Sequence, residues 1–208
     1  LNDALELDAD ALHLNENGSA VAYSLMYFSM YGEVPSSIPF SHTLAHDTLG
    51  YFDSLNNDSS LNWTLTNQLG TVVSPRAFNS STSSLLRLPA GDYVLTVTST
   101  EIEPYSFALY DLAASPVIVP GTSQAGELTT ANETDIYQFS GVAGDQVYLD
   151  VLNVSSAGRA NFRVVDKMGR ELTSSTSVID QDTFTLPADG QYFVIVEGKI
   201  NQTVATTF

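Results

Sequence analysis

The sequence has 208 residues, and its 24 acidic against 7 basic side chains give a formal net charge of −17. So acidic a chain is an improbable nucleic-acid binder, and the absence of cysteine excludes disulfides, thiolate metal sites and a cysteine nucleophile. The 43% hydrophobic content can fill a core, while no stretch is apolar for long enough to span a membrane.

Short alternating runs of Val, Tyr, Phe, Thr and Leu between turn residues predict an all-β protein. Segment 4–14 comes first and has leucines at strand-like spacing with a shift in the middle: Leu5, Leu7, Leu12 and Leu14. A strand is expected next at 21–25. The clearest strands follow at 92–98, 105–112, 135–140, 146–152, 161–166 and 191–197.

The chain contains two copies of one unit. Three blocks recur in the same order in both halves: 52–56 with 149–153, 61–70 with 160–169, and 88–97 with 186–196. The second pair of blocks puts Trp63 and Phe162 at the same inward position, before a turn closed by glycine. We therefore expect two tandem jelly-roll-like β-sandwich domains, 1–113 and 114–208, with the boundary in a stretch bracketed by two prolines.

The two copies differ in two places. The first copy has an expected insertion at 27–50, which holds Pro35, Pro39 and a cluster of aromatic residues. The second copy is expected to lack its last strand, because a counterpart of 105–112 would barely begin at Phe208. A missing strand leaves an open sheet edge and exposed core, so another segment must cover it.

The second copy resembles the bacterial pre-peptidase C-terminal (PPC) domain family over most of residues 125–197. The likeness lies in a D-x-Y-x-F strand, an Ala-Gly turn, a strand ending in a D-x-x-G turn and a final G-x-Y strand: 135–139, 143–149, 162–169 and 186–196. The first copy shares only the last two blocks and has 20–25 where D-x-Y-x-F is expected. The resemblance implies a jelly-roll sandwich in a secreted or surface protein, and no activity.

Hard oxygen ligands make calcium the most plausible cofactor, although none is certain. The candidate ligands form three clusters: Asp8, Asp10, Asn15 and Glu16; Asn56, Asn57 and Asp58; and Asn132, Glu133 and Asp135. The resemblance favours the third cluster, because some PPC domains bind calcium near the domain entrance. Solvated turn residues are the alternative interpretation. His42 and His46 would share a helix face and could hold zinc, but no third ligand is marked, so ordinary loop histidines are the preferred interpretation.

Residue patterns for catalysis are missing from the sequence, because neither H-E-x-x-H nor G-x-S-x-G occurs. We therefore expect no enzyme activity. Asn-x-Ser/Thr sites indicate N-glycans or reflect the Ser- and Thr-rich composition: Asn17, Asn57, Asn62, Asn79, Asn132, Asn153 and Asn201. Tyr27, Tyr31 and Phe40 either form a binding surface for carbohydrate or protein, or close the end of a sandwich.

These observations predict a non-catalytic, structural or adhesive module of a secreted or cell-surface protein, with neighbouring domains or identical subunits as partners. The acidic composition suits a salty or calcium-rich exterior, though intracellular proteins of halophiles share it. The alternative is a filament subunit whose segment 4–14 completes the second domain of a neighbour. A third possibility is an accessory domain that docks a protease or a polysaccharide.

Overall fold

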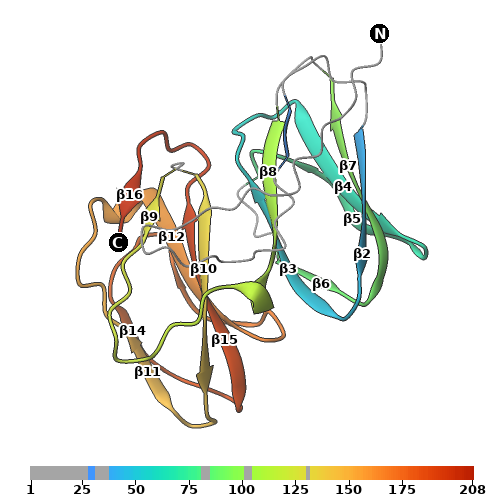
Figure 1. Ribbon diagram of the computed structural model, residues 1–208. Coiled ribbons are helices and arrows are strands. Elements are labelled where there is room, and N and C mark those ends of the chain that lie inside the picture. Colours follow the sequence, from blue (N-terminus) through green and yellow to red (C-terminus); the bar gives the residue numbers. More distant parts are fainter. Residues whose placement is uncertain (1–27, 31–37, 81–84, 101–104, 130–131) are drawn as a thin grey trace.

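The computed structural model describes residues 28–30, 38–80, 85–100, 105–129 and 132–208. They form two β-sandwiches that lie side by side (Figure 1). The leucines of segment 4–14, the strand expected at 21–25 and the calcium cluster around Asp8 lie outside the described residues.

The first sandwich is an eight-stranded antiparallel jelly roll. Its strands are β1 (Phe28–Met30), β2 (Ile38–Leu44), β3 (Thr48–Ser54), β4 (Leu61–Asn67), β5 (Gly70–Ala77), β6 (Leu85–Leu88), β7 (Gly91–Ser99) and β8 (Tyr105–Asp111). One sheet has the order β1-β8-β3-β6 and the other β2-β7-β4-β5. Strands far apart in sequence are thus neighbours, as the two interlocked Greek keys of a jelly roll require.

The second sandwich repeats this arrangement. The short connecting helix η1 (Leu112–Ala114) leads into it. Its elements are β9 (Glu127–Leu128), β10 (Thr134–Gly141), β11 (Gln146–Leu149), η2 (Ala157–Arg159), β12 (Ala160–Asp166), β13 (Glu171–Ser175), β14 (Gln181–Thr185), β15 (Gly190–Gly198) and β16 (Thr206–Thr207). A four-stranded sheet has the order β10-β15-β12-β13, and the pairs β11-β14 and β16-β9 form the rest. The predicted all-β fold of two jelly-roll-like sandwiches is confirmed. The predicted boundary after residue 113 falls within η1, between the sandwiches.

The internal repeat is preserved down to the strand register. Trp63 lies opposite Val97 in the first sandwich, and Phe162 lies opposite Val196 in the second. A tyrosine follows each matched tight turn: the Tyr93 hydroxyl donates to Pro89 O at 2.8 Å, and the Tyr192 hydroxyl donates to Ala188 O at 2.5 Å. The same hydrogen bond therefore closes the same turn in both copies.

Residues 28–30 and 38–50 of the segment expected to be an insertion are part of the first sandwich. Strand β2 pairs with β7 as β10 pairs with β15, so Phe40 occupies the position of Tyr137 in the second copy. The counterpart of the D-x-Y-x-F strand is therefore β2 and not residues 20–25. The strand was not predicted because Pro39 interrupts its pattern in the sequence. Proline is tolerated at this position because β2 is an edge strand.

The second sandwich has a counterpart of the start of β8, which begins two residues before Phe208, where the sequence predicted that this strand would barely begin. Strand β16 pairs with β9, with Thr206 opposite Leu128 as Tyr105 is opposite Met30. Backbone hydrogen bonds of 2.8 and 2.9 Å between Gly126 and Phe208 extend this pairing by one residue. The short Thr-rich end lacks an apolar alternation, which is why the strand was missed.

Each sandwich has its own aromatic core. In the first, the Phe52 and Trp63 rings stack with centroids 3.9 Å apart, and the Phe107 and Phe52 rings stack with centroids 5.3 Å apart. In the second, the rings of Phe139 and Tyr192 stack at 5.5 Å. The inward aromatic residues of the repeat therefore fill the space between the sheets in both copies.

Candidate functional site at the interface between the sandwiches

The two sandwiches are joined by a buried apolar layer. On β15, Tyr192 and Val194 point into the second core, whereas Phe193 and Ile195 belong to a separate cluster with Tyr51 of β3. Phe193 is 2% exposed and Tyr51 1% exposed. Strand β15 is therefore buried on both faces, one against its own core and the other against the first sandwich.

This layer was not predicted, but the sequence carries a signal for it. Residues 192–196 form an unbroken apolar run, which is typical of a strand covered on both faces. In the matching strand of the first copy, Val94 and Thr96 stand where Phe193 and Ile195 stand in the second, and both are only half-buried. The comparison of the two copies thus identifies the outer face of β15 as the contact face.

Polar groups at one end of the layer hydrogen-bond across the boundary. The Asp53 carboxylate accepts the backbone N–H of Thr134 at 2.9 Å, and the Asn132 amide donates to Ser54 O at 3.5 Å. Burial raises the pKa of Asp53 well above its ordinary value, the charge of Glu197 adds to this, and hydrogen bonding by Thr134 opposes it. The protonated form of Asp53 is therefore favoured more strongly here than in water.

A cation from the second sandwich lies over an aromatic ring of the first. The guanidinium carbon of Arg163 is 5.4 Å from the ring centroid of Tyr51, within the range of a cation–π contact. The same guanidinium is 3.4 Å from the Glu197 carboxylate. Burial raises the pKa of the Tyr51 hydroxyl well above its ordinary value, so this ring is neutral when Arg163 covers it.

A cleft of about 540 Å³ opens beside these polar groups, lined by residues of both sandwiches. Asp53, Asn132, Glu197 and Lys199 are among its polar residues, and Asp53 and Asn132 already hydrogen-bond across the boundary. The Lys199 ammonium donates to Gly158 O at 2.7 Å. These groups are therefore largely used to hold the protein together, and their arrangement indicates a structural joint.

The favoured calcium cluster is not assembled as a ligand set. Asn132 is 8% exposed and faces Ser54, while Glu133 accepts the Thr129 N–H at 2.7 Å. Asp135 accepts the Tyr137 hydroxyl at 3.2 Å, and burial, reinforced by the charge of Glu133, raises the pKa of Asp135 to about 6. Within the described ranges, no group of three or more His, Cys, Asp or Glu side chains could hold a metal ion.

Two residues of the second candidate calcium cluster, Asn56 and Asp58, have local structural roles. Asp58 accepts the Ser60 N–H at 2.7 Å, the Asn56 side chain accepts the Ser106 N–H, and Asn57 is exposed. His42 lies on β2, so the helix that would have placed it on one face with His46 does not form.

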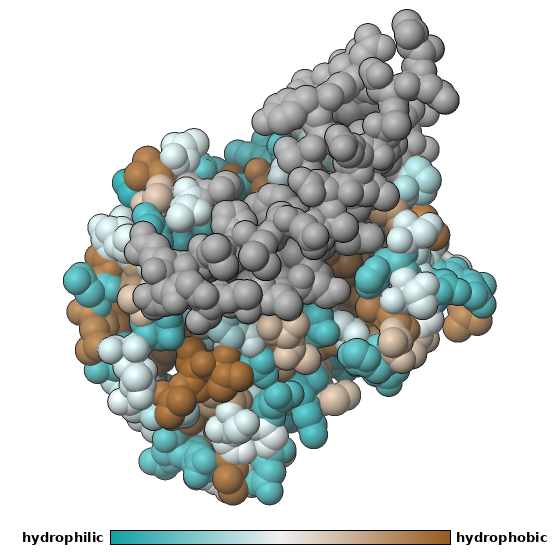
Figure 2. Space-filling model, viewed as in Figure 1, coloured by the Kyte–Doolittle hydropathy of each residue, from teal (hydrophilic) through white to brown (hydrophobic). Residues whose placement is uncertain are grey.

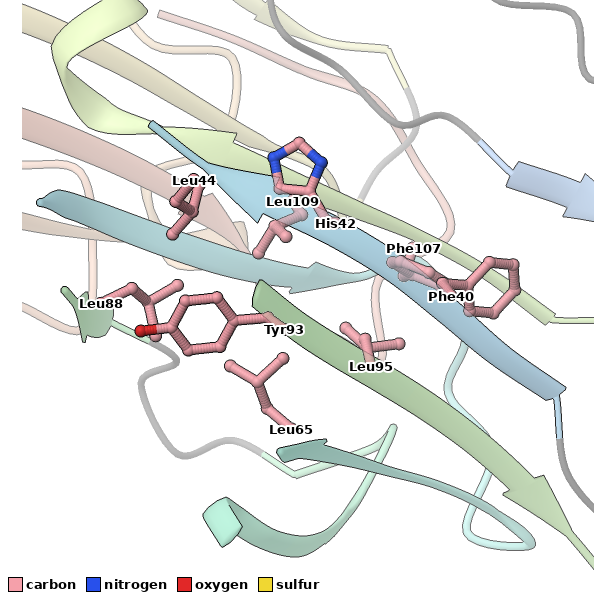
Figure 3. A pocket seen from close by; sticks show the side chains of 9 residues that line it. All are labelled: Phe40, His42, Leu44, Leu65, Leu88, Tyr93, Leu95, Phe107 and Leu109. Carbon is pink, nitrogen blue, oxygen red and sulfur yellow. The ribbon is translucent and has the colours of Figure 1, made fainter. Parts of the chain in front are cut away.

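Phe40 belongs to the first core and not to a binding surface. Its ring packs edge-to-face on Tyr105 and Phe107, with centroids 6.2 and 5.6 Å apart. Together with His42 and Leu95 it borders a cavity of about 30 Å³, whose other lining residues are almost all apolar (Figure 3). This packing favours the interpretation that Phe40 closes the end of the sandwich. Tyr27 and Tyr31 lie outside the described residues.

The Asn-x-Ser/Thr sites differ sharply in exposure. Asn57, Asn153 and Asn201 are exposed, Asn62 and Asn79 are half-buried, and Asn17 lies outside the described part of the chain. Asn132 is buried at the interface, with its amide nitrogen used by Ser54 O. A glycan on Asn132 would therefore be incompatible with the docked sandwiches.

The most exposed apolar side chains of the described residues lie outside the cleft. The most exposed are Leu69 in the β4–β5 turn at 96%, Val117 between the sandwiches at 73% and Leu152 after β11 at 72%. The view in Figure 2 shows polar and apolar residues interspersed, with one hydrophobic group on the second sandwich. Within the described part of the chain, no helix is long and apolar enough to cross a membrane.

Comparisons with known proteins add little to this. No model of a known protein family matches the chain, and no curated protein matches it. The CUB1-EGF-CUB2 domain of human MASP-1/3 is 8% identical, with 88% of this chain and 98% of that chain covered and a TM-score of 0.28. A protein from a structure of the triple jelly roll fold and turret assembly in an archaeal virus is 11% identical, with 89% and 58% covered and a TM-score of 0.22.

Such low TM-scores carry no argument about function. This chain also spans little more than half the length of the viral chain. The strand order itself makes the protein a tandem β-sandwich module.

Proposed function

We propose that the protein is a non-catalytic structural module of a secreted or cell-surface protein, in which two jelly rolls act as one rigid unit. The observation that carries this is the interface cluster, in which Phe193 and Ile195 are almost fully buried against Tyr51. Contacts between domains of one chain are usually more polar and mobile. An apolar layer bounded by buried hydrogen bonds favours a fixed spacing between the two sandwiches.

The connection between the sandwiches supports the same proposal. Ile118 N donates to Gln138 O and Gln138 N donates to Pro116 O, both at 2.8 Å, so the linker forms an isolated parallel bridge with the edge strand β10. The Gln138 side-chain amide also donates to Ser115 O at 2.5 Å. A linker held in this way covers the edge of the sheet and leaves little freedom for the two domains to swing.

The extracellular setting and the family resemblance belong to this proposal as well. The acidic composition, the exposed Asn57, Asn153 and Asn201, and the PPC-like motifs of the second copy support it. The proposed partners are neighbouring domains or identical subunits, because the joint offers a fixed geometry. Calcium remains a proposal without a site in the described part of the chain.

Small-angle X-ray scattering of the full chain tests the rigid unit. We expect the wild type to scatter as side-by-side sandwiches, and Phe193→Asp to increase the radius of gyration because it buries a charge in the interface. Val94→Asp is the matched control, since Val94 occupies the same repeat position on a half-buried face. The milder Phe193→Ala serves if the first variant loses its β-sheet circular dichroism. A wild-type radius of gyration as large as that of the Phe193 variants contradicts the proposal.

A further inference from the structure

One end of the buried layer between the sandwiches is polar, and strands of both sandwiches contribute to it. On β3, Tyr51 belongs to the layer and Asp53 is the next residue on the same face. On β15, Ile195 belongs to the layer and Glu197 is the next residue on the same face. Thr134 of β10 lies opposite Glu197 and donates its backbone N–H to the Asp53 carboxylate at 2.9 Å. Each sandwich therefore brings one carboxylate to this end of the layer.

The Arg163 guanidinium lies beside these two carboxylates. Its Nη2 atom is 3.4 Å from Glu197 Oε2, so this positive charge is already paired. Asp53 is 4% exposed, and its carboxylate is held across the boundary by a backbone N–H, which carries no full charge. Glu133, which directly precedes β10, places a further negative charge near Asp53. An ionised Asp53 therefore adds a negative charge to a buried site in which this guanidinium is already used.

The cations of the adjoining cleft do not reverse this balance. They are Arg76 of β5 and Lys199 after β15, and the Lys199 ammonium donates to Gly158 O at 2.7 Å. With both cations in place, burial still raises the pKa of Asp53 well above its ordinary value of 3.8. The Tyr51 hydroxyl on the same strand is neutral, because burial raises its pKa too. Opening the joint would return Asp53 to water, so the open form binds this proton less tightly.

We propose that the joint between the sandwiches binds a proton when it closes, so that it is closed at acidic pH and opens at its Asp53 end as pH rises. A protonated Asp53 carboxyl still offers an oxygen to the Thr134 N–H. The closing equilibrium constant should fall by up to about tenfold per pH unit above 3.8, until the closed form loses the proton as well. This inference rests on the proposed rigid module, because the closed joint is its rigid form.

The other end of the interface would keep the sandwiches together. Leu49 belongs to the layer and lies four residues before Asp53 on β3, about 13 Å away at the usual rise of a strand. A Cβ at Gly169, in the β12–β13 turn, would lie 3.1 Å from Leu49 Cδ1 and 3.8 Å from Arg87 Nε. Neither leucine nor arginine changes its charge between acidic and neutral pH. The opening is therefore a hinge motion at the carboxylate end.

Amide hydrogen exchange of Thr134 measures this opening, because the Asp53 carboxylate is the acceptor of its N–H. From about pH 4 to about pH 8, the Thr134 protection factor should fall by up to about tenfold per pH unit. It should also stay below that of Val97, which is 0% exposed in β7 and exchanges when the first sandwich unfolds. Asp53→Asn should abolish the pH dependence of Thr134 protection.

Asp135→Asn is the matched control for this experiment. Asp135 is the next residue on β10 but lies on its other face, where it accepts the Tyr137 hydroxyl. Its removal should leave the pH dependence of Thr134 protection unchanged. Equal protection of Thr134 and Val97 at every pH would mean that the joint opens only on unfolding, and it overturns the proposal. So does an unchanged pH dependence in Asp53→Asn.

A distance between two spin labels separates the failure of this inference from the failure of the rigid module. Leu69→Cys and Leu152→Cys place the labels at positions 96% and 72% exposed, one in each sandwich of a chain without cysteine. We expect one narrow distance distribution at about pH 5, near the acidic end of the range. In a Phe193→Ala background, which weakens the apolar layer, the distribution should broaden as pH rises, and added Asp53→Asn should prevent this. A distribution that stays narrow at every pH in that background overturns the proton link alone, and one that is broad at every pH in the wild type overturns the rigid module as well.

Discussion

The carboxylate of Asp53 accepts the backbone N–H of Thr134 at 2.9 Å, and this hydrogen bond ties the first sandwich to the start of β10 in the second. Both residues are almost fully buried, at 4% and 3% exposure. The repeat partner of Asp53 is Asp150, which is exposed. One position of the repeated unit therefore serves as a joint in the first copy and as a solvated residue in the second.

Replacing Asp53 separates the role of its oxygen from the role of its charge. Asp53→Ala leaves the Thr134 N–H without an acceptor, and we expect the free energy of unfolding to fall by about 1 to 3 kcal/mol. Asp53→Asn retains an acceptor oxygen without a charge to desolvate, so it should cost less. Urea unfolding of both variants at neutral pH measures these free energies. Equal losses of stability in the two variants would show that the hydrogen bond to Thr134 does not account for the stabilisation.

The buried carboxylates predict a pH dependence of stability. Burial raises the pKa of Asp135 from 3.8 to about 6, so the folded state binds the proton more tightly than the unfolded chain does. The contribution of Asp135 to the free energy of unfolding should therefore fall as pH rises from 3.8 to about 6 and then level off, by about 1.4 kcal/mol per pKa unit. Asp53 acts in the same direction.

Unfolding of wild type and Asp135→Asn across about pH 4 to 7 isolates this contribution. The variant cannot titrate at this position, so its stability should decline less steeply with pH over that interval. Parallel curves for the two proteins would rule out Asp135 as the source.

The two repeated tyrosine hydroxyls should contribute equally to stability. Tyr93→Phe and Tyr192→Phe each remove the hydrogen bond to the carbonyl four residues earlier, and each should cost about 1 kcal/mol. Neither variant leaves a cavity, because only the hydroxyl is lost. Thermal unfolding of each variant provides the measurement, and a cost at one site alone would mean that the two turns are not energetically equivalent.

A methyl group at Gly126 should displace the end of the second sandwich. A Cβ there would lie 2.4 Å from Cζ of Phe208 and 2.7 Å from the Tyr137 hydroxyl oxygen, closer than atoms can approach. Gly126→Ala should therefore speed amide hydrogen exchange in residues 206–208. Gly158→Ala is the control, since a Cβ at Gly158 meets no atom within 4 Å, and it should leave exchange there unchanged.

The sequence alone was sufficient for the strands that alternate and for the repeat. Tyr93 and Tyr192 follow matching turns in both the sequence and the structure, and strands β7, β8, β10, β12 and β15 lie within a residue or two of their predicted ranges. Local patterns of this kind are visible because turn chemistry and inward aromatics are set by neighbouring residues. The edge strand β2 was missed, because Pro39 interrupts its pattern.

The joint could not be predicted in the same way. The contact of Phe193 with the first sandwich depends on which face of β15 meets which sheet, and a local window does not contain that information. Asn132 shows the same limit: its sequence fits a calcium ligand and a glycan acceptor, yet tertiary packing places it against Ser54. Only the difference between the copies, Phe193 for Val94, pointed to a buried outer face.

The linker that runs beside β10 also determines how the protein would respond to force. Pulling the two sandwiches apart would have to break the Ile118–Gln138 and Gln138–Pro116 backbone hydrogen bonds before the linker could extend. Gln138 lies two residues after Ile136 of the apolar layer on the same strand, so tension would load the linker bonds and the layer together. The joint would therefore behave as a mechanical clamp, and the module would keep its length until the whole interface gave way.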